Sequence, residues 1–474
     1  MYCCSIQLIF FIYMNYNTVT HKNQYCSINR KEIYFILFAI IGIFLFNSTP
    51  ISVLSPILII LIGLAIGITI IYIFGHEDTR YLLDLFLIGF GLRIFVAFFS
   101  YIISFLIPNW TPGFLFSNDG WLYSDQGWQI CKFAERGIKI SADQILINPN
   151  LKIQSGNITS YDYFASYVYL VTGYSPLSLL FISCVAGSIS ALFIYLIARE
   201  LFSKRVARIS AIFAFFWPSF IMWSTQNLKE PMISMFILIF LWTIFYMHRH
   251  FAYGFLYLSI VSVLVLLKIG IPYLVMIAIA FFFSALFLAV NYLFNNKFIT
   301  SLTIFIVLIL AITFFKNSFF SLIPHYKIQS YASIFEFIDY SRDVRAYGKL
   351  QFLKGFDIST FPRILLFIPF GLFYALFSPF PWQMGSIAQI MAIPETILFY
   401  LLLPCTVIGI AFGWKRRFNQ SLLLLSIITA IMLLLALLEG NSGTLFRHRS
   451  VVFYLIFIFT AIGISLKGNK RRRC

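Results

Sequence analysis

The sequence predicts an all-α polytopic membrane protein. Apolar residues make up 61% of the 474 residues, whereas charged residues make up 11%. The apolar residues are collected in runs of about 17–25, the length that a helix needs to cross ~30 Å of hydrocarbon. Because these runs are continuous and do not alternate with polar positions, they predict spanning helices and not the strands of a membrane barrel.

Roughly 12–13 helices are expected to cross the membrane, each an apolar run bounded by polar residues. Crossings counted from the two ends of the chain disagree around residues 317–377, so one segment there is expected to be re-entrant, interfacial or miscounted. The proline-rich run that begins at Phe361 is the candidate. We expect spans at residues 33–48, 51–75, 81–107, 165–198 (broken near Gly173–Pro176), 207–223, 231–247, 252–267, 271–290, 300–316, 361–377, 396–413, 419–437 and 451–466.

The formal net charge of +17 is a topology signal. Basic residues gather at the ends of apolar runs, in Lys204–Arg208, Lys415–Arg417 and Lys470–Arg473. Lys and Arg mark cytoplasmic loops, so this distribution predicts orientation and argues against nucleic-acid binding. It places the polar segments 108–161 and 439–449 outside, in a multi-pass protein of the plasma (inner) membrane.

The chain is expected to form a single transmembrane domain over residues 1–474. An external acidic loop spans residues 108–161, a second polar loop spans 317–360, and residues 361–474 supply the C-terminal helices. Seven cysteines are scattered without a CxxC pair, so neither a metal site nor a disulfide framework is indicated.

Two carboxylates lie six residues apart in the first polar loop, just beyond the end of a membrane helix. Asp125 is expected to open a short amphipathic helix that stops near Gly137, and it is a candidate general base at the mouth of a cavity. The alternative is that Asp125 is simply a helix N-cap. Asp119 lies in Ser-Asn-Asp-Gly-Trp, which favours a turn.

Glu230 is a third candidate acid, placed directly before Pro231 and an apolar run. An acid in a first helical turn with a neighbouring proline is favoured by the helix dipole alone. Yet the predicted topology puts Glu230 on the same side of the membrane as Asp119 and Asp125. Carboxylates from two external turns would form a polar site at the rim of a helix bundle.

Four cations are candidates for binding a phosphate. Lys268 lies between two apolar runs, where an ionisable residue is costly and suggests function, although a lysine there can also snorkel to water. Arg447 and Arg449 lie in an external segment and suit bidentate phosphate binding, the alternative being a lipid-headgroup anchor. Arg345 belongs to the second polar loop.

The chain resembles the GT-C superfamily of membrane glycosyltransferases, in particular the protein mannosyltransferase-like, polyprenyl-phosphate-sugar-dependent enzymes. The likeness is best over residues 119–275. It rests on SDQGWQICKFAERG in the first loop, YDYFASYVYLVTGYSPLSLL at the next span, LIARELFSKRVARISAIFAFFWPSFIMWS after it, and NLKEPM. The resemblance implies a GT-C-like fold, whose external first loop carries short amphipathic helices.

The resemblance also implies roles for single residues. Asp125 falls at the loop carboxylate that is typically the catalytic base, with Asp119 as its rival. Glu230 falls on the second acid, and Lys268 stands near the position where many members have an arginine for the donor phosphate. The family often has Asp-Glu where this chain has Asp125-Gln126.

The implied reaction transfers a sugar from a polyprenyl-phosphate donor to a lipid, glycan or protein acceptor on the external face, with inversion. The base would deprotonate the acceptor hydroxyl, and Lys268, Arg345, Arg447 and Arg449 would stabilise the leaving phosphate. No cofactor is expected; a divalent metal is not required, although the carboxylates could host one.

Two other functions fit the same composition. An O-antigen-type polymerase or ligase is also polytopic, but its main external loop usually lies in the second half of the chain. A transporter or flippase would show broken helices in corresponding places of two halves, and the sequence shows no such symmetry. Asp84 and Arg93, within the third span, would suit either a transport path or an internal pair.

Overall fold

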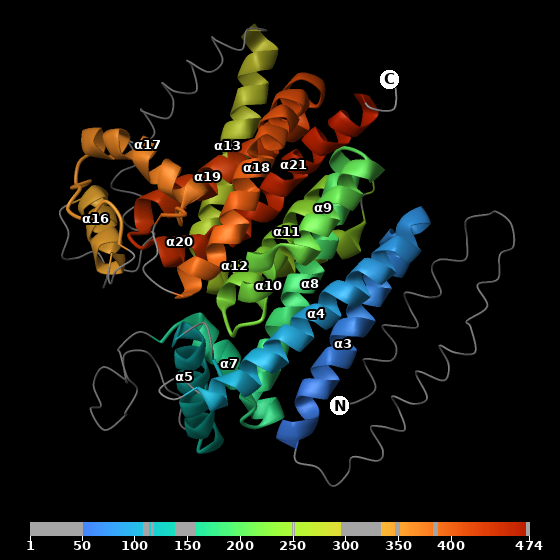
Figure 1. Ribbon diagram of the computed structural model, residues 1–474, viewed down its shortest axis with the longest axis vertical. Helices are drawn as coiled ribbons and strands as arrows, with labels where there is room; N and C mark the ends of the chain where they lie inside the picture. Colours follow the sequence, from blue (N-terminus) through green and yellow to red (C-terminus); the bar gives the residue numbers. More distant parts are fainter. Residues whose placement is uncertain are drawn as a thin grey trace, which may run out of the picture. The chain divides into compact units, whose positions relative to one another are not determined.

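The computed structural model describes residues 51–107, 113–114, 118–137, 158–248, 250, 252–294, 333–346, 351–382 and 387–470 (Figure 1). Over these residues the structure is helical and contains no strand, apart from an isolated bridge between Gln351 and Asn441. The all-α prediction is therefore confirmed. The chain divides into two units, Met1–Pro50 and Ile51–Cys474, and every described residue belongs to the second.

Within the described residues, seven helices are long and apolar enough to cross a membrane. Two further pairs are bent, by 52° and 60°, and two apolar helices are shorter. The seven lie in α3 (Ile51–Phe74), α4 (Thr79–Leu106, preceded by the turn η1, His76–Asp78), α8 (Pro176–Leu201), α11 (Lys229–Met247), α13 (Ile271–Phe294), α18 (Ile387–Arg416) and α19 (Phe418–Leu438). The bent pairs are α9 (Lys204–Phe216) with α10 (Pro218–Ser224), and α20 (Ser442–His448) with α21 (Ser450–Lys470). The shorter helices are α12 (Tyr253–Ile269) and α17 (Phe361–Phe377).

Three polar helices complete the described fold. They are α5 (Asn118–Glu135), α7 (Ser160–Thr172) and α16 (Ile334–Arg345). Figure 1 shows α5 lying along α7, and α16 with α17 beside α19 and α20.

The predicted spans agree with these helices except where the backbone breaks. The break near Gly173–Pro176 is confirmed, because α7 ends at Thr172 and Gly173 adopts a φ of 67°. The run 207–223 is not one straight helix: it bends at Trp217, because Pro218 has no backbone N–H to continue the helix. The predicted spans 33–48 and 300–316 lie outside the described residues, so the count of 12–13 crossings and the single-domain organisation stay predictions.

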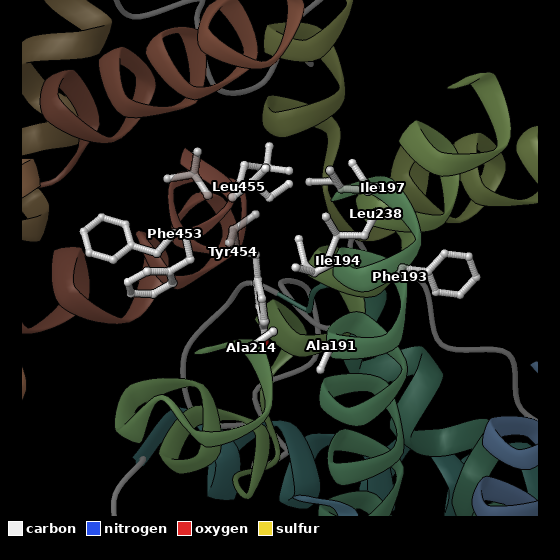
Figure 2. Packing of buried hydrophobic residues seen from close by; sticks show 14 of the residues in the cluster. Ala191, Phe193, Ile194, Ile197, Ala214, Leu238, Phe453, Tyr454 and Leu455 are labelled. Atoms are coloured by element: carbon white, nitrogen blue, oxygen red, sulfur yellow. The ribbon is translucent and has the colours of Figure 1, made fainter. Parts of the chain in front are cut away.

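The core forms around α8, the most deeply buried span. Its Ala191, Ile194 and Ile197 face the neighbouring helices α9, α11 and α21 (Figure 2). Across the molecule, α18 and α21 touch through glycines: a Cβ at Gly409 would collide with the carbonyl of Phe459. Within a membrane the hydrophobic effect does not drive helices together. Close packing of the two backbones, which small residues allow, therefore contributes to their association. This contact positions α21 and, through it, α20.

Arg93 holds the broken span α9–α10 in place. Its side chain is fully buried, and it donates to the carbonyls of Gly89, Ala214 and Phe215 at 2.9–3.1 Å and to the Ser224 hydroxyl at 3.0 Å. The break frees carbonyls that no backbone N–H satisfies, and the guanidinium supplies the missing donors. Arg93 therefore has a structural role, and it does not pair with Asp84, which is exposed.

A buried capping box begins α7. Thr159 donates its backbone N–H and its hydroxyl to Asp162, at 2.6 and 2.7 Å. Burial disfavours the charged carboxylate more than the two Thr159 bonds and the nearby Lys229 favour it, so the pKa of Asp162 is raised to about 6. The start of α7 therefore depends on pH.

Replacing Arg93 with methionine should destabilise the protein by roughly 2–4 kcal/mol, because the carbonyls at the helix break lose their donors. Thermal unfolding of the purified protein in detergent measures the effect. The control is Arg80→Met on the same helix, whose side chain is exposed and whose loss should change the midpoint little. Equal midpoints for the two variants would contradict the structural role of Arg93.

Asp162 should make stability fall as pH rises from about 4 to 6. Its folded-state pKa lies above the unfolded value, so the folded protein binds the extra proton in this window and loses that advantage above it. The thermal midpoint of wild type minus that of Asp162→Asn should therefore be larger at pH 5 than at pH 7.5. Asp125→Asn, on the neighbouring α5, serves as control; a difference that is constant or reversed with pH would refute the assignment.

Candidate functional site

The first polar loop supplies α5, and the helix begins earlier than expected. It starts at Asn118, so Asp119 lies in its first turn and the prediction that Asp125 opens this helix is wrong. An acid in the first turn is favoured by the helix dipole, which here outweighs the turn propensity of Asn-Asp-Gly. The expected stop is confirmed, because α5 ends at Glu135 and Gly137 has a φ of 73°.

The N-terminal end of α5 is fastened to the segment before α11. Asn227 donates to the carbonyl of Gly120 at 2.8 Å, and its side-chain oxygen accepts from the Tyr161 hydroxyl at 3.0 Å. All three residues are buried. Because Asn227 precedes Glu230 by three residues, this link brings Asp119 close to Glu230.

Five charged side chains then meet, and we call them the acid–base cluster: Asp119, Glu230, Glu439, Arg447 and His448. Arg447 contacts Asp119 Oδ2 through Nη1 at 2.6 Å and Glu230 Oε1 through Nε at 3.4 Å. His448 contacts Glu230 Oε1 through Nε2 at 2.9 Å and Glu439 Oε1 through Nδ1 at 2.8 Å. The cluster therefore joins α5, α11, the end of α19 and α20.

Exposure separates the members of the cluster. The side chain of Asp119 is 44% exposed, whereas that of Glu230 is 2% and that of Arg447 is 12% exposed. Asp119 is thus the carboxylate that a substrate can approach, with Arg447 and Glu230 behind it.

The fold of α20 explains how Arg447 and His448 reach the cluster. Asn441 caps the helix by accepting from the backbone N–H groups of Gly443 and Thr444, at 2.8 and 3.4 Å. The Thr444 hydroxyl donates to Glu439 at 3.1 Å. Burial opposes ionisation of Glu439, but His448, Arg345 and Thr444 outweigh it and lower its pKa to about 2.

Two tyrosines near the cluster were not singled out from the sequence. Tyr123 lies one helical turn after Asp119, and burial together with the charges of Glu230 and Asp119 raises its pKa, so it remains a neutral phenol. Tyr273, in α13, is buried and interacts electrostatically with Glu230. The spacing of four residues from Asp119 could have indicated Tyr123, whereas no local signal indicates Tyr273.

Arg345 is the predicted cation that lies beside the cluster. It is exposed at the end of α16, donates to the carbonyl of Leu438 at 3.1 Å and acts electrostatically on Glu439. Lys268 is exposed at the end of α12 and makes no ion pair with a described residue. Of the predicted cations, Arg447 and Arg345 are therefore at the site.

Asp125 and Arg449 lie away from the cluster. Asp125 accepts from Gln129 at 2.6 Å, on a different face of α5 from Asp119. Arg449 is buried, donates to the carbonyls of Leu376, at 3.0 Å, and Ser378, and lies over the rings of Phe446 and Phe453. Arg449 therefore joins α20 and α21 to the end of α17, which is a structural role.

The described residues contain no group of three or more His, Cys, Asp or Glu side chains suited to a metal ion. The carboxylates of the acid–base cluster are instead paired with Arg447 and His448. That the reaction requires no metal stays a prediction.

Comparison with known proteins finds a family match over part of the chain. A family model described as dolichyl-phosphate-mannose-protein mannosyltransferase matches residues 160–315. No curated protein matches the chain in sequence. Among solved structures, the chain is similar to the apo form of the Archaeoglobus fulgidus oligosaccharyltransferase, with 16% identity and a TM-score of 0.44. That likeness covers 81% of this chain and 51% of the other, so the chain spans about half the length of that protein.

The family match covers Glu230 and Lys268 but ends before Arg345 and the C-terminal half of the cluster. Its description is that of a membrane glycosyltransferase family, and the seven long apolar helices agree with an integral membrane protein. The match confirms the predicted resemblance of this chain to the protein mannosyltransferase-like enzymes of the GT-C superfamily.

Proposed function

We propose that the protein is an inverting glycosyltransferase that moves a sugar from a polyprenyl-phosphate donor to an acceptor hydroxyl outside the membrane. The observation that carries the proposal is the partly exposed Asp119 carboxylate, held by Arg447 at the edge of a buried acid–base cluster. The family match supports glycosyl transfer, and its description names dolichyl-phosphate-mannose, a lipid-linked donor.

The distribution of basic residues supports the external location in this proposal. Lys204, Arg205 and Arg208 lie just beyond the C-terminal end of α8, and by the positive-inside rule they mark the cytoplasmic side. The cluster gathers at the start of α11 and the end of α19, one crossing away from the nearest basic segments. Nucleotide sugars are not supplied outside the cell, whereas a lipid-linked sugar is presented in the membrane itself.

Asp119 acts as the general base in this proposal. The acceptor hydroxyl gives its proton to Asp119 while its oxygen forms a bond to the anomeric carbon of the donor sugar. The bond between that carbon and the phosphate oxygen breaks, and polyprenyl phosphate leaves with the electron pair. A single displacement inverts the anomeric configuration. Arg447 holds Asp119 by one carboxylate oxygen, Oδ2, and this contact orients the base.

Arg345 is the cation that we assign to the departing phosphate. Arg447 is engaged by two carboxylates, and Arg449 is buried against backbone carbonyls. Arg345 is exposed beside Glu439, so its guanidinium can reach a phosphate without breaking an ion pair. Lys268, exposed at the end of α12, is a second cation for the same lipid.

Asp119→Asn should reduce transfer by about 10²–10⁴-fold, because the amide does not accept the hydroxyl proton. The matched control is Asp125→Asn on the same helix, which should retain near-normal activity. The assay follows radiolabelled sugar from polyprenyl-phosphate mannose into acceptors of membranes that contain the protein. Loss of activity only in Asp125→Asn would move the base to Asp125, and the absence of covalent transfer by wild type would favour a transporter.

Arg345→Gln should raise the KM for the lipid-linked donor roughly five-fold, the effect of losing about 1 kcal/mol from a partly exposed phosphate contact. The same labelled-donor assay, run over a range of donor concentrations, measures it. Arg363→Gln removes a comparably exposed arginine that is paired with Asp357 and should leave KM unchanged. An unchanged KM in Arg345→Gln would remove this arginine from the donor site.

A further inference from the structure

Each ring nitrogen of His448 lies close to a different buried carboxylate. Nδ1 is hydrogen-bonded to Glu439 Oε1 at 2.8 Å, whereas Nε2 lies 2.9 Å from Glu230 Oε1 as a charge contact and 3.4 Å from Arg447 Nη2. The imidazole is 17% exposed, and the two acids are 2% and 5% exposed. The ring therefore bridges the start of α11 and the end of α19.

The two buried carboxylates beside the ring favour one protonation state of this bridge. An ionised carboxylate only accepts hydrogen bonds, whereas a neutral imidazole has one donor nitrogen and one acceptor nitrogen. The hydrogen bond to Glu439 places a proton on Nδ1. A second proton on Nε2 turns its 2.9 Å approach to the buried Glu230 carboxylate into an attraction between opposite charges. Glu439 is ionised, because Thr444 donates to its second oxygen and Arg345 is nearby. Glu230 lies in the first turn of α11 and beside Arg447, which likewise favour its charged form.

We infer that His448 is a doubly protonated positioning residue that holds Glu230 and Glu439 in place and thereby keeps Arg447 oriented toward Asp119. The protonation state stands on the two carboxylate contacts of the ring and on their burial. Its effect on transfer rests on the proposed function, because only that function makes Asp119 the base.

The charge balance of the site shows why the proton matters. Three carboxylates, Asp119, Glu230 and Glu439, face two cations, Arg447 and the imidazolium. The other titratable groups around them are Lys229 on α11, Arg345 on α16, Tyr123 on α5, Tyr161 on α7 and Tyr273 on α13. If His448 lost its proton, Arg447 would be the remaining cation within the cluster for Glu230. Its contact with Asp119 would weaken, and the base would lose its orientation.

The protonation state is tested by ¹⁵N NMR of the full-length protein labelled at histidine and held in lipid nanodiscs. The chain has six histidines, so the His448 signal is identified from the spectrum that His448→Gln lacks. If that variant does not fold, a variant with the other histidines changed to Gln leaves the His448 signal alone. Two protonated ring nitrogens from pH 6.5 to 8.5 are expected. An unprotonated nitrogen at pH 7.5 would overturn the inference.

The positioning role is tested by the pH profile of transfer from labelled polyprenyl-phosphate mannose. His448→Gln should lower kcat about 10²-fold, the cost of a small misplacement of a catalytic group, and leave the donor KM unchanged. His448→Arg restores a permanent cation between the two acids, so it should recover part of kcat and remove the fall in activity that we expect of wild type at alkaline pH. A raised KM with normal kcat, or a wild-type alkaline limb in His448→Arg, would refute the role.

The two proposals fail separately. If Asp119→Asn keeps full transfer while NMR shows the imidazolium, the assigned base is wrong and the inferred protonation state stands. If Asp119→Asn is inactive while NMR shows a neutral ring, the proposed base stands and the inference about His448 is overturned.

Discussion

Charge pairing at the edge of the membrane bundle is the interaction on which the candidate site depends. Arg447 contacts Asp119 across 328 positions of sequence and also contacts Glu230, so a C-terminal helix completes a site that the first loop begins. Removing one partner would leave a buried charge uncompensated, which costs far more than the pair itself contributes. His448 and Glu439 extend the pairing, and the cluster therefore ties four helices together as well as forming the site.

Broken helices allow polar groups to reach this place. The backbone break around Trp217 and the C-terminal end of α17 expose carbonyl groups that need donors inside the bundle. Buried arginines meet that need: Arg93 binds the carbonyls of α9, and Arg449 binds those at the end of α17. Irregular backbone at membrane depth is tolerated only where protein groups satisfy it in this way. Arg93 and Arg449 thus have structural roles, whereas Arg447 belongs to the candidate site.

The sequence predicted the membership of the site better than its geometry. Asp119, Glu230 and Arg447 stood out because charge is rare in so apolar a chain, and the structure brings all three together. Asp125 was preferred because it begins an amphipathic pattern, but the helix starts at Asn118 and carries Asp125 to another face. Arg449 looked equivalent to Arg447 from its position two residues away. Because the chain bends at the junction of α20 and α21, Arg447 contacts the acid–base cluster whereas Arg449 contacts the backbone at the end of α17.

The sequence by itself determined the helical membrane class, most helix boundaries and the polar segments, because hydrophobic run length, proline and glycine act locally. Only the tertiary structure decided which charges pair. That choice depends on the packing of α18 on α21 and of α5 on α7, which rotates and shifts side chains hundreds of residues apart into contact. A shift of one residue turns a helical side chain by about 100°, so no local pattern specifies that His448 lies between two carboxylates while Arg449 does not.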